Sequence, residues 1–215
     1  MDYRNSDFVD EKAFEQYLRD MGVTEEQLEQ DLEDHLTLDG QFYAREYQVF
    51  TKNEESICVY AADADIEDGG VSIIDWLDNM SVEELMEFWE DKEERNKIKG
   101  LMRYPGRYHE WLMLAAIPIL KAMEIPMGKI LEYRTLTAEC NFFINDTECW
   151  HGGEGSTTMH NDLFMEIGNA YLDCAKRRVH HPFYVLQSYL QRFAEKYYRD
   201  RTESMPDALK ALTGM

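Results

Sequence analysis

Two histidines bracket a glycine-rich stretch, WHGGEGSTTMHN at Trp150 to Asn161, which is the most chemically unusual window of this chain. Ser156 is predicted to be the N-cap of a helix that carries His160 in its first turn. The backbone N–H groups and the positive dipole end of such a helix favour an anion such as phosphate. The alternative is structural: the glycines make a tight turn and His160 packs under it. The candidate phosphate-binding residues here are Gly152, Gly153, Gly155 and Ser156.

A third histidine, His109, lies in the segment RYPGRYHEW at residues 103–111. Pro105 and Gly106 predict a turn, and the apolar spacing after Tyr108 predicts a helix whose inner face carries His109. An inward histidine either bonds to the backbone in a core, or serves as a metal ligand or general base. In the second case Glu110 and Asn161 are the further candidate metal ligands.

Residues 103–175 resemble the HNH and endonuclease VII class of nucleases, as found in the C-terminal domains of bacterial polymorphic toxins. The resemblance rests on RYHEW followed by WHGGEGSTTMHN. It implies a Mg²⁺- or Zn²⁺-dependent nuclease that uses His109, His151 and His160. Either His151 or His160 would activate water, and the other would hold the metal with Asn161 or Glu110. The chain departs from the pattern because its first histidine is predicted on a helix and no basic groove accompanies it.

The four cysteines, Cys58, Cys140, Cys149 and Cys174, are too scattered to predict a disulfide framework. We expect reduced thiols in a cytoplasmic protein. The alternative is that Cys140 and Cys149 join His151 around zinc, although no Cys-x-x-Cys pair is present. No apolar run approaches the length of a membrane span, and the N-terminus lacks the features of an export signal, so no membrane partner is expected.

Acidic residues are concentrated in the first half of the chain. The net charge is −21, and residues 1–100 hold 29 acidic and 9 basic residues while residues 101–215 hold 14 and 13. This step predicts an acidic helical module at 1–100 and a mostly helical, histidine-bearing domain at 101–215, or else one continuous domain. A combined hypothesis is that the first module covers a nuclease-like second domain.

Such acidity repels nucleic acid and anionic membranes and attracts basic partners, so nucleic acid is not an expected ligand of the whole chain. In size and charge the chain resembles the acidic immunity proteins that neutralise nuclease toxins. We therefore predict a cytoplasmic inhibitor, without a cofactor, of a basic partner such as a nuclease toxin. The alternatives are the HNH-like nuclease and a merely solvated surface, so whether the chain is an enzyme stays open. The candidate partner-binding residues are Glu25, Glu26, Glu29, Asp31, Glu33, Asp34, Asp63, Asp65, Glu67 and Asp68.

Periodicity predicts an α+β fold that is predominantly helical, with a small antiparallel hairpin in the N-terminal half. Two helices are expected in residues 11–36 and a hairpin in residues 40–61. A capping box at Ser81 and Glu84 is expected to open a helix that ends at Gly100 in a solvated charge run. Further predictions are a strand over 136–144, the helix after the glycine loop, and a last long helix from Pro182. Arg177 and Arg178 form a basic cluster that suits a helix end or a phosphate contact.

Overall fold

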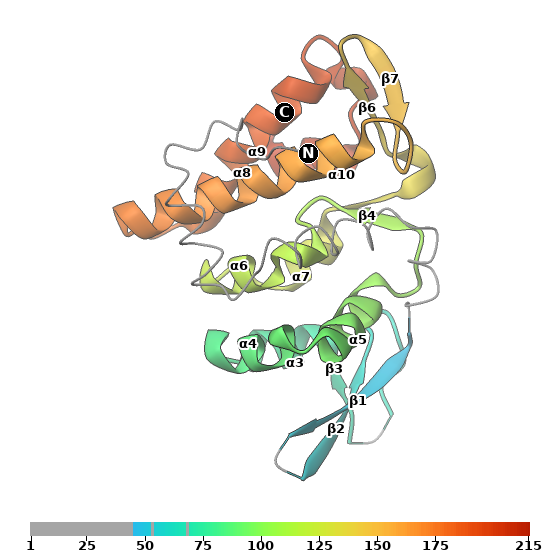
Figure 1. Cartoon of the computed structure of the whole chain (residues 1–215), viewed down its shortest axis with the longest axis vertical. Helices are drawn as coiled ribbons and strands as arrows, with labels where there is room; N and C mark the ends of the chain where they lie inside the picture. Colours follow the sequence, from blue (N-terminus) through green and yellow to red (C-terminus); the bar gives the residue numbers. More distant parts are fainter. Residues whose placement is uncertain (1–44, 53, 68) are drawn as a thin grey trace.

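The computed structural model describes residues 45–52, 54–67 and 69–215, and the predicted predominantly helical α+β class is confirmed there (Figure 1). The helices predicted within residues 11–36, and the acidic residues Glu25 to Asp34 with them, lie outside this range. In the described part of the chain, no helix combines the length and apolarity needed to cross a bilayer.

The predicted hairpin is confirmed. Strand β1 (Tyr47–Lys52) pairs antiparallel with β2 (Glu55–Tyr60), and β3 (Val71–Ser72) adds to β2 in parallel. Side chains alternate across the strands, so that Phe50 and Val59 are buried while Tyr47 and Val49 are exposed on the other face.

Three helices follow the sheet: α3 (Ile73–Asn79), α4 (Val82–Glu90) and α5 (Lys92–Arg103). The capping box of Ser81 and Glu84 is confirmed. The single helix predicted from there to Gly100 is wrong, because Asp91 leaves the helical conformation and caps α5. Its charge run is also partly buried: Arg95 is 3% exposed and donates a hydrogen bond to the Trp89 carbonyl.

The helix predicted from Tyr108 is wrong as well. Strand β4 (Tyr108–Glu110) pairs antiparallel with β5 (Arg134–Leu136), and the backbone of Met113 then turns to a φ of 49°, which a helix cannot accommodate. A 3₁₀ turn, Leu114–Ala116, leads to α6 (Ile117–Ala122), and α7 (Gly128–Glu132) follows. Pro118 lies in the first turn of α6, where its missing N–H costs nothing.

A second hairpin precedes the longest helices. Strands β6 (Asn141–Ile144) and β7 (Thr147–Trp150) pair antiparallel around Asn145 and Asp146, both at positive φ. The predicted strand over 136–144 is therefore only partly confirmed, because Thr137–Glu139 is a 3₁₀ turn, and β7 was not predicted. Helices α8 (Ser156–Arg177) and α9 (Pro182–Tyr198) are confirmed, and α10 (Asp207–Thr213) ends the chain.

The elements stack along the longest axis of the molecule (Figure 1). The pair α8 and α9 lies at one end, α6 and α7 lie in the middle, and α3 to α5 lie above the β1–β2 hairpin at the other end. One buried apolar cluster extends from Phe50 to Leu212. The predicted boundary near residue 100 falls inside α5.

Candidate metal centre

Three histidines from separate elements meet at one point. One ligating nitrogen of each of His109, His151 and His160 lies within 4.8 Å of those of the other two, and each pair of ring centroids is 5.0 Å apart. His109 and His160 are fully buried, and His151 is half-buried. The structure thus brings together the three histidines that the nuclease alternative requires, although β4 and not a helix supplies the first.

The pairing of β4 with β5 positions His109. His109 lies opposite Thr135, whose Oγ1 accepts a hydrogen bond of 2.9 Å from the indole Nε1 of Trp111. The Trp111 ring meets the His109 ring edge-on, with centroids 4.4 Å apart. A fully buried tryptophan, fixed by its only polar group, therefore supports one wall of the cluster.

The loop after β7 positions His151. Its backbone N–H donates to the carbonyl of Cys140, and the N–H of Gly152 donates to Ser156 Oγ at 3.0 Å. Gly155 has a φ of +79°, and a Cβ there would lie 2.3 Å from Ile144 Cδ1. The φ at 155 therefore favours glycine, and a side chain there would also require the end of the Ile144 side chain to rotate away.

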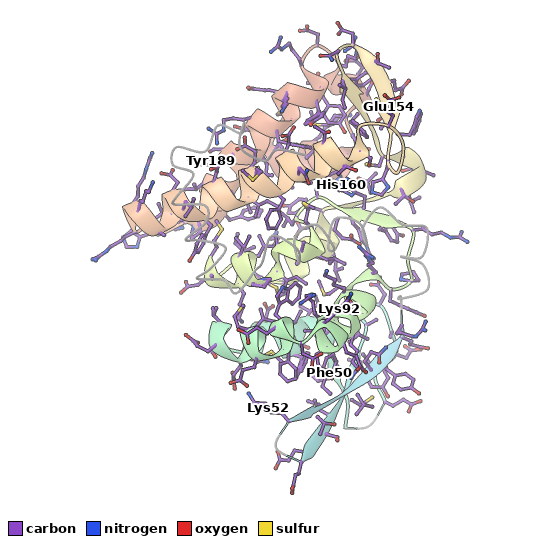
Figure 2. The ribbon with its side chains drawn as sticks, in the orientation of Figure 1. Phe50, Lys52, Lys92, Glu154, His160 and Tyr189 are labelled. Carbon is purple, nitrogen blue, oxygen red and sulfur yellow. The ribbon has the colours of Figure 1, made fainter. Side chains whose placement is uncertain are left out.

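His160 is the fifth residue of α8, at the end of the helix nearest the second hairpin (Figure 2). Its Nδ1 is 2.7 Å from the backbone carbonyl oxygen of Ser156. A carbonyl only accepts, so Nδ1 carries the proton and the neutral ring keeps its lone pair on Nε2. Ser156 is not the N-cap predicted from the sequence: Gly155, in the left-handed conformation, holds that position, and Ser156 is the first helical residue.

Burial keeps all three rings neutral. It lowers the pKa of His160 to about 3 and that of His151 to about 4, and it lowers the pKa of His109 well below its usual value. Repulsion among the rings adds to this for His109 and His160. The charge of Arg103 lowers all three pKa values further, which the sequence reasoning missed. The sequence feature that could have pointed to Arg103 is its position, six residues before His109.

Neutral imidazoles are common ligands of Zn²⁺ and of neighbouring transition metals, whereas Mg²⁺ prefers oxygen. A tetrahedral ion with bonds of about 2.0–2.1 Å needs ligand nitrogens about 3.4 Å apart. The candidate ligand nitrogens lie within 4.8 Å of one another, so a bound ion of this kind would draw them closer together. Three protein ligands leave a fourth position for water, as in catalytic zinc sites.

The other predicted ligands do not join this group. Among the described histidines, cysteines and acids, the one metal-ligating group consists of the three imidazoles, without Glu110, Cys140 or Cys149. Glu110 leaves β4 on the side opposite His109. Both of its carboxyl oxygens are buried, neither has a hydrogen-bond partner within the described residues, and burial raises its pKa to about 7. Asn161 is next to His160 on α8, with a buried Oδ1 that likewise has no partner in the described chain.

The candidate phosphate contacts are split between two places. Gly152, Gly153 and Ser156 lie at the start of α8, whereas Arg177 and Arg178 lie at its far end, about 30 Å away at 1.5 Å per residue. Arg177 makes an ion pair with Asp173 at 2.7 Å. The structure does not bring the loop and the basic cluster together.

The acids of the loop after β2 are not part of the histidine group, and Asp63 pairs with Arg134 at 2.6 Å. Asp65 and Glu67 are exposed, and Asp68 lies outside the described residues.

Comparisons of the chain with models of protein families, with curated proteins and with solved structures find no match. The function therefore has to be argued from the geometry of the site.

Proposed function

We propose that the protein binds a divalent transition metal ion, Zn²⁺ by ligand class, at His109, His151 and His160, and that it is a metal-dependent hydrolase. The observation that supports this is the convergence of His109 on β4, His151 in the loop after β7 and His160 on α8, of which His109 and His160 are buried and all three have lowered pKa values. One ligating nitrogen of each ring lies within reach of a single point, so that one shared ion would bind all three side chains.

The chemistry follows from the ligands. Three neutral imidazoles would hold the ion without cancelling its double charge, and an ion held in this way would supply Lewis-acid chemistry and lower the pKa of a water at its open position to about 7. The Ser156 carbonyl orients His160 by its hydrogen bond to Nδ1, as outer partners of metal-bound histidines do. The nuclease predicted from the sequence is the version of this proposal in which the substrate is a phosphodiester.

Metal analysis of the full-length protein tests the proposal. We expect about one equivalent of Zn²⁺ after dialysis, bound with a Kd below about 1 μM as a three-ligand site allows. His151→Ala and His160→Ala should each lose binding by at least tenfold. His180→Ala, which removes an exposed histidine outside the cluster, should leave the affinity unchanged.

Hydrolysis is tested on the zinc-loaded protein with bis(p-nitrophenyl) phosphate, p-nitrophenyl acetate and single- and double-stranded DNA. Turnover that EDTA abolishes, and that His151→Ala lacks, is the expected result. Binding without turnover of any of these substrates would reduce the site to a structural one. Failure of the wild type to bind Zn²⁺, Co²⁺, Ni²⁺ or Mn²⁺ would exclude the metal centre itself.

The charge step is the specific observation that favours a second candidate, the acidic inhibitor of a basic partner. It needs no metal, so the two proposals separate cleanly. A pull-down from the native host, with EDTA present, should recover a basic protein that is released by salt.

A further inference from the structure

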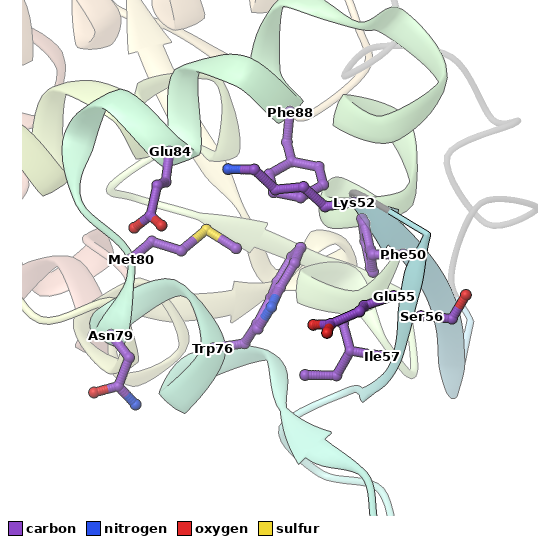
Figure 3. A pocket seen from close by; sticks show the side chains of 10 residues that line it. All are labelled: Phe50, Lys52, Glu55, Ser56, Ile57, Trp76, Asn79, Met80, Glu84 and Phe88. Atoms are coloured by element: carbon purple, nitrogen blue, oxygen red, sulfur yellow. The ribbon is translucent and has the colours of Figure 1, made fainter.

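A cavity lies between the β1–β2 hairpin and helices α3 and α4 (Figure 3), and its residues Phe50 and Lys52 lie near the opposite end of the molecule from His160 (Figure 2). Its volume is about 660 Å³, within the range of ligand-binding pockets. Its residues come from both sides of this gap: Phe50, Lys52, Glu55, Ser56, Ile57, Trp76, Asn79, Met80, Glu84 and Phe88.

The cavity is open on one side, and we call it the groove; its wall is aromatic. The ring of Trp76 lies 4.3 Å from that of Phe50 and 5.2 Å from that of Phe88, measured between centroids. Figure 3 shows the Trp76 ring standing between Met80 and Ile57. Ile57 is 36% exposed, and Trp76, Met80 and Phe88 are only half-buried, so the groove presents an apolar surface that the described chain leaves uncovered.

The rim of the groove is acidic. Its one basic residue, Lys52, is already paired with Glu87 at 2.7 Å, and that hydrogen bond raises the pKa of its ammonium group. Glu55 and Glu84 remain, on opposite sides of the Trp76 ring (Figure 3). Glu84 caps α4 with one oxygen, whereas Glu55 makes no ion pair or side-chain hydrogen bond within the described residues.

We propose that this groove binds a basic, apolar segment of a partner protein, in which a large apolar side chain enters beside Trp76 and flanking lysines or arginines meet Glu55 and Glu84. Charge complementarity supports this occupant, because the described residues 45–52, 54–67 and 69–100, to which the groove belongs, hold 15 acidic and 6 basic residues. Aromatic walls of this kind are typical anchors of protein interfaces. The inference deepens the second candidate function and is independent of the metal centre.

Fluorescence anisotropy with the labelled peptide KLKFKLK, at 150 mM salt and with EDTA present, tests the groove. Saturable binding is expected, with KSKSKSK and ELEFELE bound at least tenfold more weakly. Glu55→Lys should weaken binding about tenfold, since it replaces an attraction with a repulsion at the rim of the groove. Glu54→Lys, which makes the same charge change outside the groove lining, should weaken it less than threefold.

Ile57→Ser tests the apolar contact and should weaken binding about tenfold. Its matched control is Val49→Ser, at a residue of the same hairpin that is 48% exposed on the opposite face. Equal losses in Glu54→Lys and Glu55→Lys, or no loss in Ile57→Ser, would overturn the proposal, and so would absence of binding. If the full-length protein still captures a basic partner after any of these results, the groove fails while the second candidate function stands.

Discussion

The buried imidazole of His160 makes the stability of the protein depend on pH. Its pKa is about 3 in the fold, against about 6.5 in an unfolded chain. The unfolded state therefore binds the proton first as the pH falls. The contribution of the neutral His160 ring to the free energy of unfolding is fully present above pH 6.5 and is lost between pH 6.5 and 3. The lowered pKa values of His151 and His109 act in the same direction.

We expect the free energy of unfolding of the metal-free protein to fall by several kcal/mol between pH 7 and 4.5, with about 1.4 kcal/mol per pH unit from each fully buried histidine. His160→Gln should reduce this slope by about one such increment, and His180→Gln should not change it. Urea unfolding in EDTA at a series of pH values measures both. If the free energy of unfolding depends on pH equally in the wild type and in His160→Gln, the ring takes up its proton in the folded protein as readily as in the unfolded chain.

Glu110 has the opposite effect on the pH dependence of stability. Its carboxyl has a pKa of about 7 in the fold, so folding becomes less favourable as the pH rises from about 4.3 through 7, where the unfolded state loses the proton first. Glu110→Gln should raise the free energy of unfolding by about 2–3 kcal/mol at pH 8 and much less at pH 5. A variant that is less stable than the wild type at pH 8 would mean that the Arg103 and Arg134 charges stabilise the carboxylate more than burial destabilises it.

Gly155 and Gly152 form a matched pair for testing how the loop positions the histidines. Both have a φ of +79°, but a Cβ would lie 2.3 Å from Ile144 Cδ1 at 155 and would meet open space at 152. Gly152→Ala should cost about 1 kcal/mol of stability from its φ alone. Gly155→Ala should cost up to about 1 kcal/mol more, because the end of the Ile144 side chain must rotate away from the added methyl group, and should weaken Zn²⁺ binding more than Gly152→Ala does. Thermal unfolding and zinc titration of both variants check this, and equal costs would contradict it.

At the scale of elements, the short pairing of β4 with β5 fixes His109 through Trp111. Thr135→Val should cost about 1–3 kcal/mol, because it leaves a buried indole N–H without its acceptor, and should also weaken Zn²⁺ binding. Thr137→Val is the control: its hydroxyl makes a longer bond, 3.3 Å, to the Arg107 carbonyl in an exposed setting. Chemical denaturation and zinc titration of both variants test this prediction. Unchanged zinc affinity in Thr135→Val would mean that Trp111 does not help to position His109.

The elements predicted correctly from the sequence are those with local signals. The capping box at Ser81, the polar turn between β1 and β2, and Pro182 at the start of α9 each act within a few residues. Strand β4 was missed because it exists only through β5, about 25 residues further along the chain. The apolar spacing after Tyr108 imitates a helix, and nothing local opposes it until the turn at Met113.

The candidate site was predicted in part for the same reason. The residues His109, His151 and His160 stood out by type and by their neighbours, but their convergence depends on the second hairpin, the β4–β5 pair and α8 packing around one point. Glu110 was grouped with them because it is adjacent in sequence, and the alternation of a strand sends it the other way. Arg103 was missed because its influence acts through space, from the end of α5.

At the scale of the whole molecule, the charge distribution opposes folding. A net charge of −21 raises the energy of the compact state through self-repulsion, and most of that charge lies in residues 1–100. Salt screens such repulsion over about 10 Å at 0.1 M. The folded protein should therefore become more stable as the salt concentration rises, which is the reverse of what isolated surface ion pairs produce.

We expect the melting temperature to rise by several degrees between 10 and 300 mM NaCl in EDTA at pH 7.5. Glu90→Lys, at an exposed position on α4 in the acidic half, should reduce this salt response and raise stability at low salt. Glu203→Lys makes the same change of net charge in the nearly neutral half, so its effect should be smaller. Calorimetry of the three proteins distinguishes local from global charge: equal responses in the two variants would mean that only the net charge matters, and a fall in melting temperature with salt would mean that attractive ion pairs outweigh the repulsion.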